Sequence, residues 1–575
     1  MKKLLFLIII LTSFSVHSQL SKKHFIPPLA ASEDIGDQFI YVSTPSNGTI
    51  TYTIKPVGRP DSETITRTVS NALPSRVLLT TSYGQLFADE FSSGKVLANK
   101  GYIIDAESEI YVSIRMKASS GNHAGALVSK GSSALGYEFR MGGFVNENST
   151  GGYLSFVSVM ATENNTKVIF DDLTAGMILE GYSGSFPINV TLNQGESYVV
   201  AVASNSGSNP NDLVGALVVG DKPIVVNSGS ASGSFAINGG RDFGLDQIAG
   251  ASKIGSEYIF VRGDGDDAWE NILLIAHENN TTIEINGVAV PGVNLNAGEY
   301  YVAEGDKYNT LGNMYVKTSK NVFAYQGVGG LDGNGNPNRA NQGLFFVPPL
   351  SCNNKGSINN IAQIQSIGDE TFNGGITIVT NAGATVTIND LPITDFNVIG
   401  PSNIDGRTGD YVTYKVTGLT DNVKVSSTEE LYCAYFNYNG FATSGAFYSG
   451  FPTPPEVNFN LTVGSLGNCI PNVKLDAGNT DAFDSYEWYF DDGNGYQPTG
   501  ITASPYTPTI PGKYKLVGKI DCSGETIDSP EVPVSLCPDD FDNDLTGEYK
   551  KEYYILGLNF KLHPEAKFYR GQRDP

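Results

Sequence analysis

The sequence predicts an all-β protein made of four repeated units followed by a smaller β domain. Gly and Tyr are abundant, with 65 and 30 copies among 575 residues, and charged residues make up only 17%. This composition is typical of many short strands joined by tight turns. A strand-turn-strand phrase also recurs along most of the chain, which indicates a repeat architecture.

The first repeated phrase places Asn or Gly at a turn that is followed by an alternating strand. Both residue types tolerate positive φ at low cost, so they suit a tight turn. The alternation after the turn is that of a half-buried strand. The turn residues of the four copies are Asn47, Asn165, Asn280 and Gly383.

Two further phrases keep nearly the same spacing. An apolar strand phrase recurs around Ile110, Ile224, Val322 and Leu431. A third phrase is expected to mark unit starts, since Phe25-Ile-Pro-Pro-Leu29 matches Phe346-Val-Pro-Pro-Leu350, and residues 36–42 match residues 255–261.

These phrases predict four units of roughly 105 to 115 residues between Ser21 and Pro455. Four tandem sandwiches or a propeller-like ring both fit units of this size. The ring is favoured, because the three phrases follow in the same order in all units. The first and last units also lack the sequence divergence that is typical of capping repeats. The repeat region is therefore expected to span residues 19–455.

The sequence pattern changes from Glu456 onward. The stretch Tyr486-Glu-Trp488-Tyr-Phe490-Asp-Asp-Gly493 places a lone Trp on an alternating strand before an acidic turn, as in the core strand of a small β-sandwich. We expect a separate domain over residues 456–537. The remaining residues, 538–575, form an atypical tail that resembles nothing upstream.

The N-terminus carries the pattern of a secretory signal over residues 1–18. Lys2 and Lys3 precede the apolar run Leu4–Leu11, and small residues precede an expected cleavage after Ser18. No later run is long and apolar enough to predict a transmembrane segment. The protein is therefore expected to be secreted or at the cell surface. A net charge of −23 argues against nucleic acid as a partner, because phosphates need a basic surface.

The five cysteines lie late in the chain and form no Cys-x-x-Cys pair, which argues against a zinc site. In an exported protein they are expected to oxidise. Pairing within units favours Cys352 with Cys433 and Cys469 with Cys522. Cys537 would then be left over.

Several of these phrases resemble the IgGFc-binding protein N-terminal domain family, above all Phe25-Ile-Pro-Pro-Leu, Lys222-Pro-Ile-Val-Val-Asn-Ser-Gly and Arg241-Asp-Phe-Gly-Leu-Asp-Gln-Ile248. The resemblance covers about Ser21 to Pro455 and implies an extracellular binding or adhesion role. The Trp488 stretch is similar to PKD and Ig-like domains. This combination resembles secreted surface proteins of the Bacteroidetes.

The tail begins with Asp540-Phe-Asp542-Asn-Asp544, which looks like the start of a thrombospondin type 3 calcium repeat. Ca²⁺ prefers carboxylate and carbonyl oxygens, so Asp540, Asp542 and Asp544 are the candidate metal ligands. The pattern departs from the repeat at Leu545, where Gly is expected. No cofactor other than Ca²⁺ is expected.

Catalytic chemistry has little support in the sequence. There is no Gly-x-Ser-x-Gly elbow, and the tripeptide Arg262-Gly-Asp264 is interpreted as a plain turn. We therefore predict a non-catalytic binding or adhesion protein whose partner is an extracellular glycan or protein. The alternatives are a structural spacer, favoured by a rod of units, and a polysaccharide-active enzyme, favoured by two carboxylates converging in a cleft.

Overall fold

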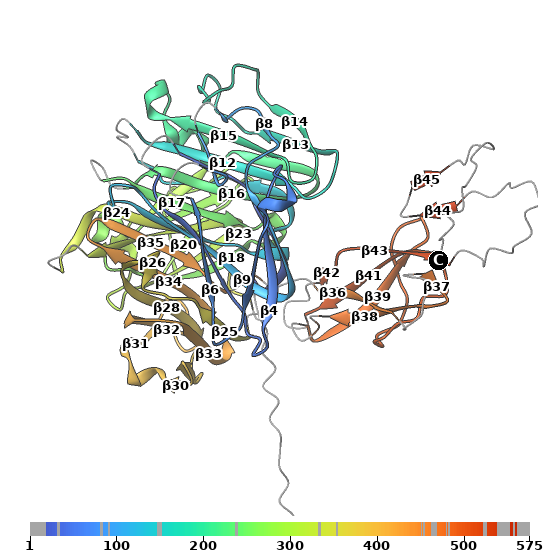
Figure 1. Ribbon diagram of the computed structural model, residues 1–575. Coiled ribbons are helices and arrows are strands. Elements are labelled where there is room, and N and C mark those ends of the chain that lie inside the picture. The colour runs from blue at the N-terminus through green and yellow to red at the C-terminus, as the bar shows by residue number, and fades with distance from the viewer. Residues whose placement is uncertain are drawn as a thin grey trace, which may run out of the picture. The chain divides into compact units, whose positions relative to one another are not determined.

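The computed structural model describes most of the chain and divides it into two compact units, Met1–Thr453 and Pro454–Pro575 (Figure 1). The described residues are 19–31, 35–80, 84–89, 92–146, 152–235, 240–331, 335–351, 355–449, 451, 455–461, 469–478, 480, 483–520, 526–537, 553–555 and 558–560. Strands dominate this part of the chain, and its helical segments are 3₁₀ turns of three or four residues. The predicted all-β class is thus confirmed.

The first repeat is organised around one long strand, β9 (Tyr102–Lys117). Its first half pairs with β1 on one side and with the β4–β5 hairpin on the other. Its second half pairs with β10 on one side and with β3, which continues to β6, on the other. The bounds are β1 (Ser21–Ile26), β3 (Gln38–Ser43), β4 (Ile50–Pro56), β5 (Ile65–Val69), β6 (Ser75–Thr80) and β10 (Ala124–Val128).

The second and third repeats have the same topology around β16 and β23. The second comprises β11 (Gly136–Arg140), β12 (Leu154–Ala161), β13 (Thr166–Asp171), β14 (Ile188–Leu192), β15 (Ser197–Ala203), β16 (Leu217–Gly233) and β17 (Asp242–Ile248). The third comprises β18 (Gly255–Val261), β19 (Ile272–Ala276), β20 (Ile283–Ile285), β21 (Val288–Ala289), β22 (Tyr300–Ala303), β23 (Asn313–Leu331) and β24 (Pro337–Phe346).

In the fourth repeat the long strand is divided into β33 and β34, which are separated at Leu431. The pairing partners are otherwise those of the other repeats. Its strands are β25 (Lys355–Ile361), β28 (Asn373–Asn381), β29 (Val386–Ile388), β30 (Leu391–Pro392), β31 (Asn397–Asn403), β32 (Tyr411–Leu419), β33 (Val423–Glu430), β34 (Tyr432–Asn439) and β35 (Ala442–Phe447).

Each long strand changes its burial pattern at the apolar phrase singled out in the sequence. In β16 the first half alternates between buried and more exposed positions, whereas the residues from Ile224 to Ala231 are all buried. The same change occurs near Ile110 in β9 and Val322 in β23. The first half therefore has one face toward solvent, and the second half is covered on both faces. The predicted second phrase marks this transition in all four repeats.

The four repeats close into a ring. The last strand of each repeat lies innermost: β10 contacts β17, β17 contacts β24, β24 contacts β35, and β35 contacts β10. The diagonal pairs β10 with β24 and β17 with β35 also contact each other, so these strands pack around a filled centre. The ring favoured by the sequence is therefore the arrangement observed, and a rod of tandem sandwiches is not.

The predicted turn phrase is confirmed in three copies and differs in one. Asn165, Asn280 and Gly383 have φ values of 56°, 62° and 87°, each between the second and third strand of its repeat. In the first copy neither Asn47 nor Gly48 takes positive φ. This turn uses the side chains of Thr44 and Ser46 to bond its backbone instead.

The prediction that the third phrase marks the start of a unit is wrong, because its copies lie in non-equivalent strands. Residues 36–42 lead into β3, the second strand of the first repeat, whereas residues 255–261 form β18, the first strand of the third. Phe25 likewise lies in a first strand and Phe346 ends a last strand. These strands all pair with a long strand and bury apolar side chains against it, so they select similar residues at non-equivalent positions.

The C-terminal unit is a small β domain with its own core. Trp488 is fully buried and its indole N–H donates to the carbonyl of Ala503 at 3.1 Å, as expected for a core-strand Trp. Its strands are β36 (Glu456–Leu461), β37 (Cys469–Ile470), β38 (Val473–Gly478), β39 (Ser485–Asp491), β40 (Gln497–Pro498), β41 (Gly512–Lys519), β42 (Thr526–Asp528), β43 (Val532–Leu536), β44 (Tyr553–Ile555) and β45 (Leu558–Phe560). No helix in the described parts of the chain is long and apolar enough to cross a membrane.

Candidate functional site

Strand β17 carries two buried aspartates that bond to all three other innermost strands. Asp242 and Asp246 are four residues apart and so project from the same face of the strand. Phe243 and Leu245, on the opposite face, belong to the apolar core shared with the first repeat. The chain stretch Arg241–Ile248, which carries the family resemblance, is thus the strand that holds the ring centre together.

Asp242 joins the second repeat to the first and the fourth. Its Oδ1 accepts from the backbone N–H of Ala124 in β10 at 2.6 Å, and its Oδ2 accepts from the N–H of Thr443 in β35 at 2.9 Å. Burial raises the pKa of Asp242 well above its ordinary value, and these N–H groups act in the opposite direction. The carboxylate therefore serves as a fixed acceptor for the exposed edges of two neighbouring strands.

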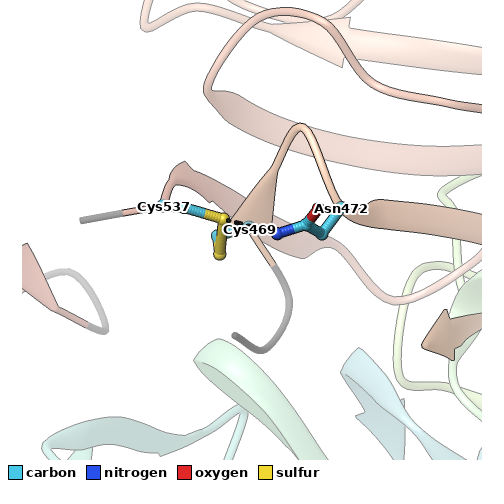
Figure 2. The surroundings of a disulfide bond; sticks show 3 residues. All are labelled: Cys469, Asn472 and Cys537. Atoms are coloured by element: carbon cyan, nitrogen blue, oxygen red, sulfur yellow. Dashed lines mark hydrogen bonds between the residues drawn. A yellow bond between two sulfur atoms is a disulfide. The ribbon is translucent and has the colours of Figure 1, made fainter. Parts of the chain in front are cut away.

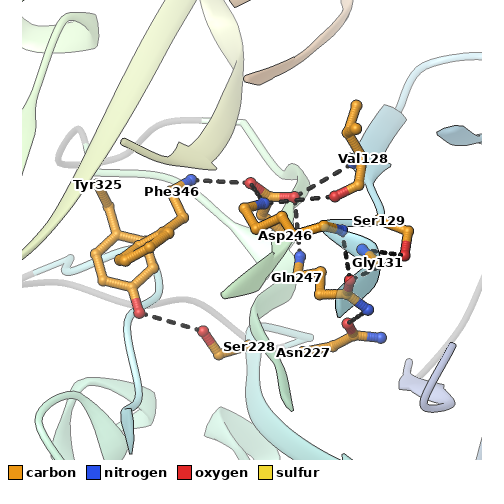
Figure 3. A network of polar contacts seen from close by, with 10 residues as sticks. Val128, Ser129, Gly131, Asn227, Ser228, Asp246, Gln247, Tyr325 and Phe346 are labelled. Atoms are coloured by element: carbon orange, nitrogen blue, oxygen red, sulfur yellow. Dashed lines mark hydrogen bonds and ion pairs between the residues drawn. The ribbon is translucent and has the colours of Figure 1, made fainter. Parts of the chain in front are cut away.

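Asp246 forms a buried ion pair with Lys130 at 3.0 Å, and both side chains are at most 1% exposed. Its Oδ2 also accepts from the N–H of Phe346 in β24, and its Oδ1 from the N–H of Val128 (Figure 3). Burial raises the pKa of Asp246 and lowers that of Lys130, while their mutual attraction opposes both shifts. The pair connects the first, second and third repeats.

Gln247 extends this network to the N-terminal strand. Its Oε1 accepts from the backbone N–H of Lys130 and the hydroxyl of Ser129, and its Nε2 donates to the carbonyl of Phe25 in β1. His24 contacts Ser129 through Nδ1 at 3.0 Å and is fully buried. Burial lowers the pKa of His24 to about 4, so its imidazole is neutral at physiological pH.

The ring is closed between its first and last repeats by Arg115 of β9. The guanidinium is buried and donates to the backbone carbonyls of Ala362, Gln363 and Ser366 at 2.7, 2.7 and 3.0 Å. It also lies over the ring of Tyr41, 4.2 Å from the centroid. Lys117 and Arg76 add ion pairs to the same segment of the fourth repeat.

These buried groups hold the fold together and are not arranged for chemistry. Each carboxylate of the central network accepts hydrogen bonds from backbone N–H groups or from Lys130, and none is exposed to solvent. A substrate could reach them only if the innermost strands separated. The sequence resemblance found this strand but gave no sign that its polar residues are internal.

The loop that contains Arg262-Gly-Asp264 is also held in place by ion pairs and hydrogen bonds. Arg262 pairs with Asp267 at 2.8 Å, and Asp264 pairs with Lys415 of the fourth repeat. Inside the loop, Glu270 accepts from the backbone N–H groups of Gly263, Gly265 and Gly329. Burial raises the pKa of Glu270 to about 7 against the effect of these donors. The loop is therefore a packed contact between repeats and not the plain solvated turn expected.

A cluster of two buried tyrosines and three charged groups, two of them partly exposed, spans the boundary between the third and fourth repeats. We call it the seam cluster; it consists of Glu257, Tyr315, Arg407, Tyr411 and Glu430. Arg407 lies between the rings of Tyr315 and Tyr411, 5.7 and 5.6 Å from their centroids, and pairs with Glu257 at 3.1 Å.

The two carboxylates of the seam cluster differ in environment. Glu257 is 27% exposed and accepts from the hydroxyl of Tyr315 at 2.9 Å. Glu430 is buried, accepts from the hydroxyl of Tyr411 at 2.9 Å, and has its pKa raised by burial. The Arg407 side chain, 31% exposed, is the part of this cluster that a ligand could contact together with Glu257. Sequence reasoning missed the cluster because its members come from five separate strands and loops.

A comparison with known protein families shows to which family this chain belongs. The family model described as IgGFc binding protein matches residues 124–436, from the start of β10 into β34. This is more than half of the chain. The chain belongs to the IgGFc-binding protein family. The match is narrower than the resemblance seen in the sequence, but it includes the second and third repeats completely.

Other comparisons add little to the family assignment. No curated protein matches the sequence. Among solved structures, an α-L-rhamnosidase of Streptomyces avermitilis is 9% identical with a TM-score of 0.11; the match covers 77% of this chain and 58% of that one. Sidekick-1 immunoglobulin domains 1–5 are 10% identical with a TM-score of 0.09, covering 91% and 100%. The eight N-terminal Ig domains of the Down syndrome cell adhesion molecule are 10% identical with a TM-score of 0.12, covering 91% and 60%.

The disulfide pairing expected in this family member is corrected. Cys469 is bonded to Cys537 and not to Cys522, which lies outside the described residues (Figure 2). Strand β37 runs parallel to the end of β43, and this pairing places the Cα atoms of Cys469 and Cys537 4.8 Å apart. Asn472 donates to the Cys537 sulfur at 3.5 Å.

The expected pairing of Cys433 with Cys352 is also not observed. Cys433 is a free thiol that is fully buried in the apolar core of the fourth repeat, and burial raises its pKa. Cys352 lies outside the described residues. Because Cys433 lies on the core-facing side of β34, its side chain serves as a small apolar group.

The candidate calcium ligands Asp540, Asp542 and Asp544 lie outside the described residues, so calcium binding there stays a prediction. Within the described ranges, no group of three His, Cys, Asp or Glu side chains could hold a metal ion.

Proposed function

We propose that this member of the IgGFc-binding family is an exported binding or adhesion protein that recognises an extracellular protein or glycan without catalysis. The observation that carries the proposal is the family match, which extends over most of the ring. The closed ring supports it, because a rigid scaffold can present surface groups in fixed geometry. A spacer role loses its main support, since it was favoured by a rod.

The seam cluster is the proposed contact surface. Arg is among the residue types enriched where binding energy concentrates, since it offers a large contact area and directional donors. Here Arg407 is held by two tyrosine rings and by Glu257, so little conformational freedom is left to lose on binding. The guanidinium of Arg407 and the carboxylate of Glu257 are the groups offered to a ligand, and both suit either a polar protein side chain or the hydroxyl groups of a sugar.

The test measures binding of the mature protein to a glycan array and to intact cells whose surface proteins are present or removed by protease. We expect binding to one of the two, and about a tenfold loss of affinity for Arg407→Ala. Arg59→Ala is the matched control, because Arg59 is exposed and has only a long contact of 3.9 Å to Glu63. Unchanged thermal melting shows that a variant is folded.

Three other outcomes would each contradict part of the proposal. Absence of binding to glycans and to cell surfaces would remove the binding function. Binding that Arg407→Ala leaves unchanged would move the contact surface elsewhere. Hydrolysis of a polysaccharide that disappears in Glu257→Gln would replace the binding role with an enzymatic one.

A further inference from the structure

Gln19, the residue that follows the expected cleavage site, is fully buried. Its side chain has 0% exposure, and the next residue, Leu20, packs in an apolar core with Tyr111 and Val128. Strand β1 begins two residues later, at Ser21. Glutamine side chains are mostly exposed, so a fully buried Gln at this position requires an explanation.

The amide of Gln19 has no hydrogen-bond partner. Both its Nε2 and its Oε1 are buried and unbonded. A primary amide offers two donors and an acceptor, and burying these without partners is unfavourable. The site therefore suits a smaller and less polar group than the glutamine side chain.

The backbone of Gln19 is also unusual, because its φ is 65°. A residue with a Cβ is strained in this left-handed region while a preceding peptide is attached. The angle φ is defined by the carbonyl carbon of residue 18. If the peptide bond after Ser18 is cut, as the signal pattern predicts, this angle and its strain cease to exist.

Cleavage after Ser18 would leave an α-ammonium group on Gln19, next to its buried side chain. A charge at the edge of an apolar core is costly unless it is paired. An N-terminal glutamine has a chemical route to remove that charge, because its own α-nitrogen can reach its side-chain carbonyl carbon in a five-membered ring.

We propose that Gln19 is a modification site and that the mature chain begins with pyroglutamate at this position. The neutral α-amine attacks Cδ of the side chain, a new N–Cδ bond forms, and the Cδ–Nε2 bond breaks. Nε2 leaves as ammonia with the proton lost by the α-nitrogen. No oxidant or reductant is needed, and the product is a neutral lactam with one N–H and one ring carbonyl.

The lactam fits the site better than either alternative. It removes the charge of the α-amine and the two N–H donors of the amide, and it shortens the side chain into a ring. The buried product would also be out of reach of aminopeptidases. Strand β1 would stay paired from its first residue, which keeps the contacts of His24 to Ser129 and to the carbonyl of Ile110 in place.

The test is mass spectrometry of the N-terminal peptide from protein that has been exported by a host with its own signal peptidase. We expect a peptide that begins at position 19, has the mass of the sequence minus one ammonia, and resists Edman degradation. A free glutamine at position 19, or a mature chain that begins at another residue, overturns the proposal. Modification that appears only on storage overturns it as well.

Burial of the product is tested with pyroglutamyl aminopeptidase. We expect the native protein to keep its first residue while the same protein, unfolded in urea and digested, loses it. Removal at equal rates from both forms would contradict the structural role. The variant Gln19→Ala cannot cyclise and is expected to melt at a lower temperature. Leu73→Ala, which changes an exposed apolar residue, is the control and is expected to melt unchanged.

Discussion

The guanidinium of Arg115 lies 5.1 Å from the ring centroid of Tyr435, although the first residue belongs to the first repeat and the second to the fourth. This contact joins the two ends of the repeat region. Between them, β17 connects the remaining innermost strands through Asp242 and Asp246. The ring is therefore closed by buried polar groups as well as by apolar packing.

Arg115→Ala is expected to destabilise the ring by about 3 to 5 kcal/mol, because it leaves three backbone carbonyls of the fourth repeat without donors in a buried site. The free energy of unfolding in urea measures this change. Arg59→Ala is expected to alter stability by no more than about 0.5 kcal/mol. Equal effects of the two substitutions would contradict the proposed closure.

The Lys130–Asp246 pair is expected to show strong coupling in a double-mutant cycle. Either Lys130→Met or Asp246→Asn alone leaves a buried polar group without its partner and is expected to cost about 3 to 5 kcal/mol. The double variant is expected to cost less than the sum of both by about 0.5 to 3 kcal/mol. Additive losses would mean that the two side chains stabilise the ring independently.

Glu270 is expected to make the stability of the ring depend on pH. Its pKa in the folded protein is about 7, above its ordinary value of 4.5. Its contribution to stability is therefore complete below pH 4.5 and is lost as the pH rises through about 7. Relative to Glu270→Gln, the wild-type protein should lose on the order of 3 kcal/mol across this window. A difference between the two proteins that does not change with pH would disprove this.

The disulfide is expected to stabilise the C-terminal unit alone. Cys469 and Cys537 are 68 residues apart, and closing a loop of this size contributes about 4 kcal/mol in the chain-entropy model. The paired substitution Cys469→Ala with Cys537→Ala is expected to lower one of two calorimetric transitions and leave the other in place. A shift of both transitions would show that the two units unfold together.

Much of the fold was predictable from local pattern. Turn residues such as Asn165 and Gly383 need a particular backbone conformation, so they recur wherever that turn recurs. The apolar phrase at Ile224 was visible for a similar reason, because it marks where a strand becomes buried on both faces. The alignment of residues 36–42 with residues 255–261 failed, since burial selects similar residues in non-equivalent strands.

The candidate site was much less predictable. Glu257 and Arg407 are about 150 residues apart, and only the closing of one repeat on the next brings them together. No local spacing carries such information. Asp242 and Asp246 were noticed as part of a family phrase, but their role as buried acceptors depends on strands from three other repeats. The pairing of Cys469 with Cys537 likewise follows from a parallel strand contact that spacing does not reveal.

Small-angle X-ray scattering of residues 19–453 tests most directly the claim that the four repeats form a closed ring. For a compact particle of this length we expect a radius of gyration of about 22 Å and a bell-shaped distance distribution. A radius of gyration roughly twice as large, with an extended tail in the distance distribution, would mean that the repeats form a rod and would contradict the ring.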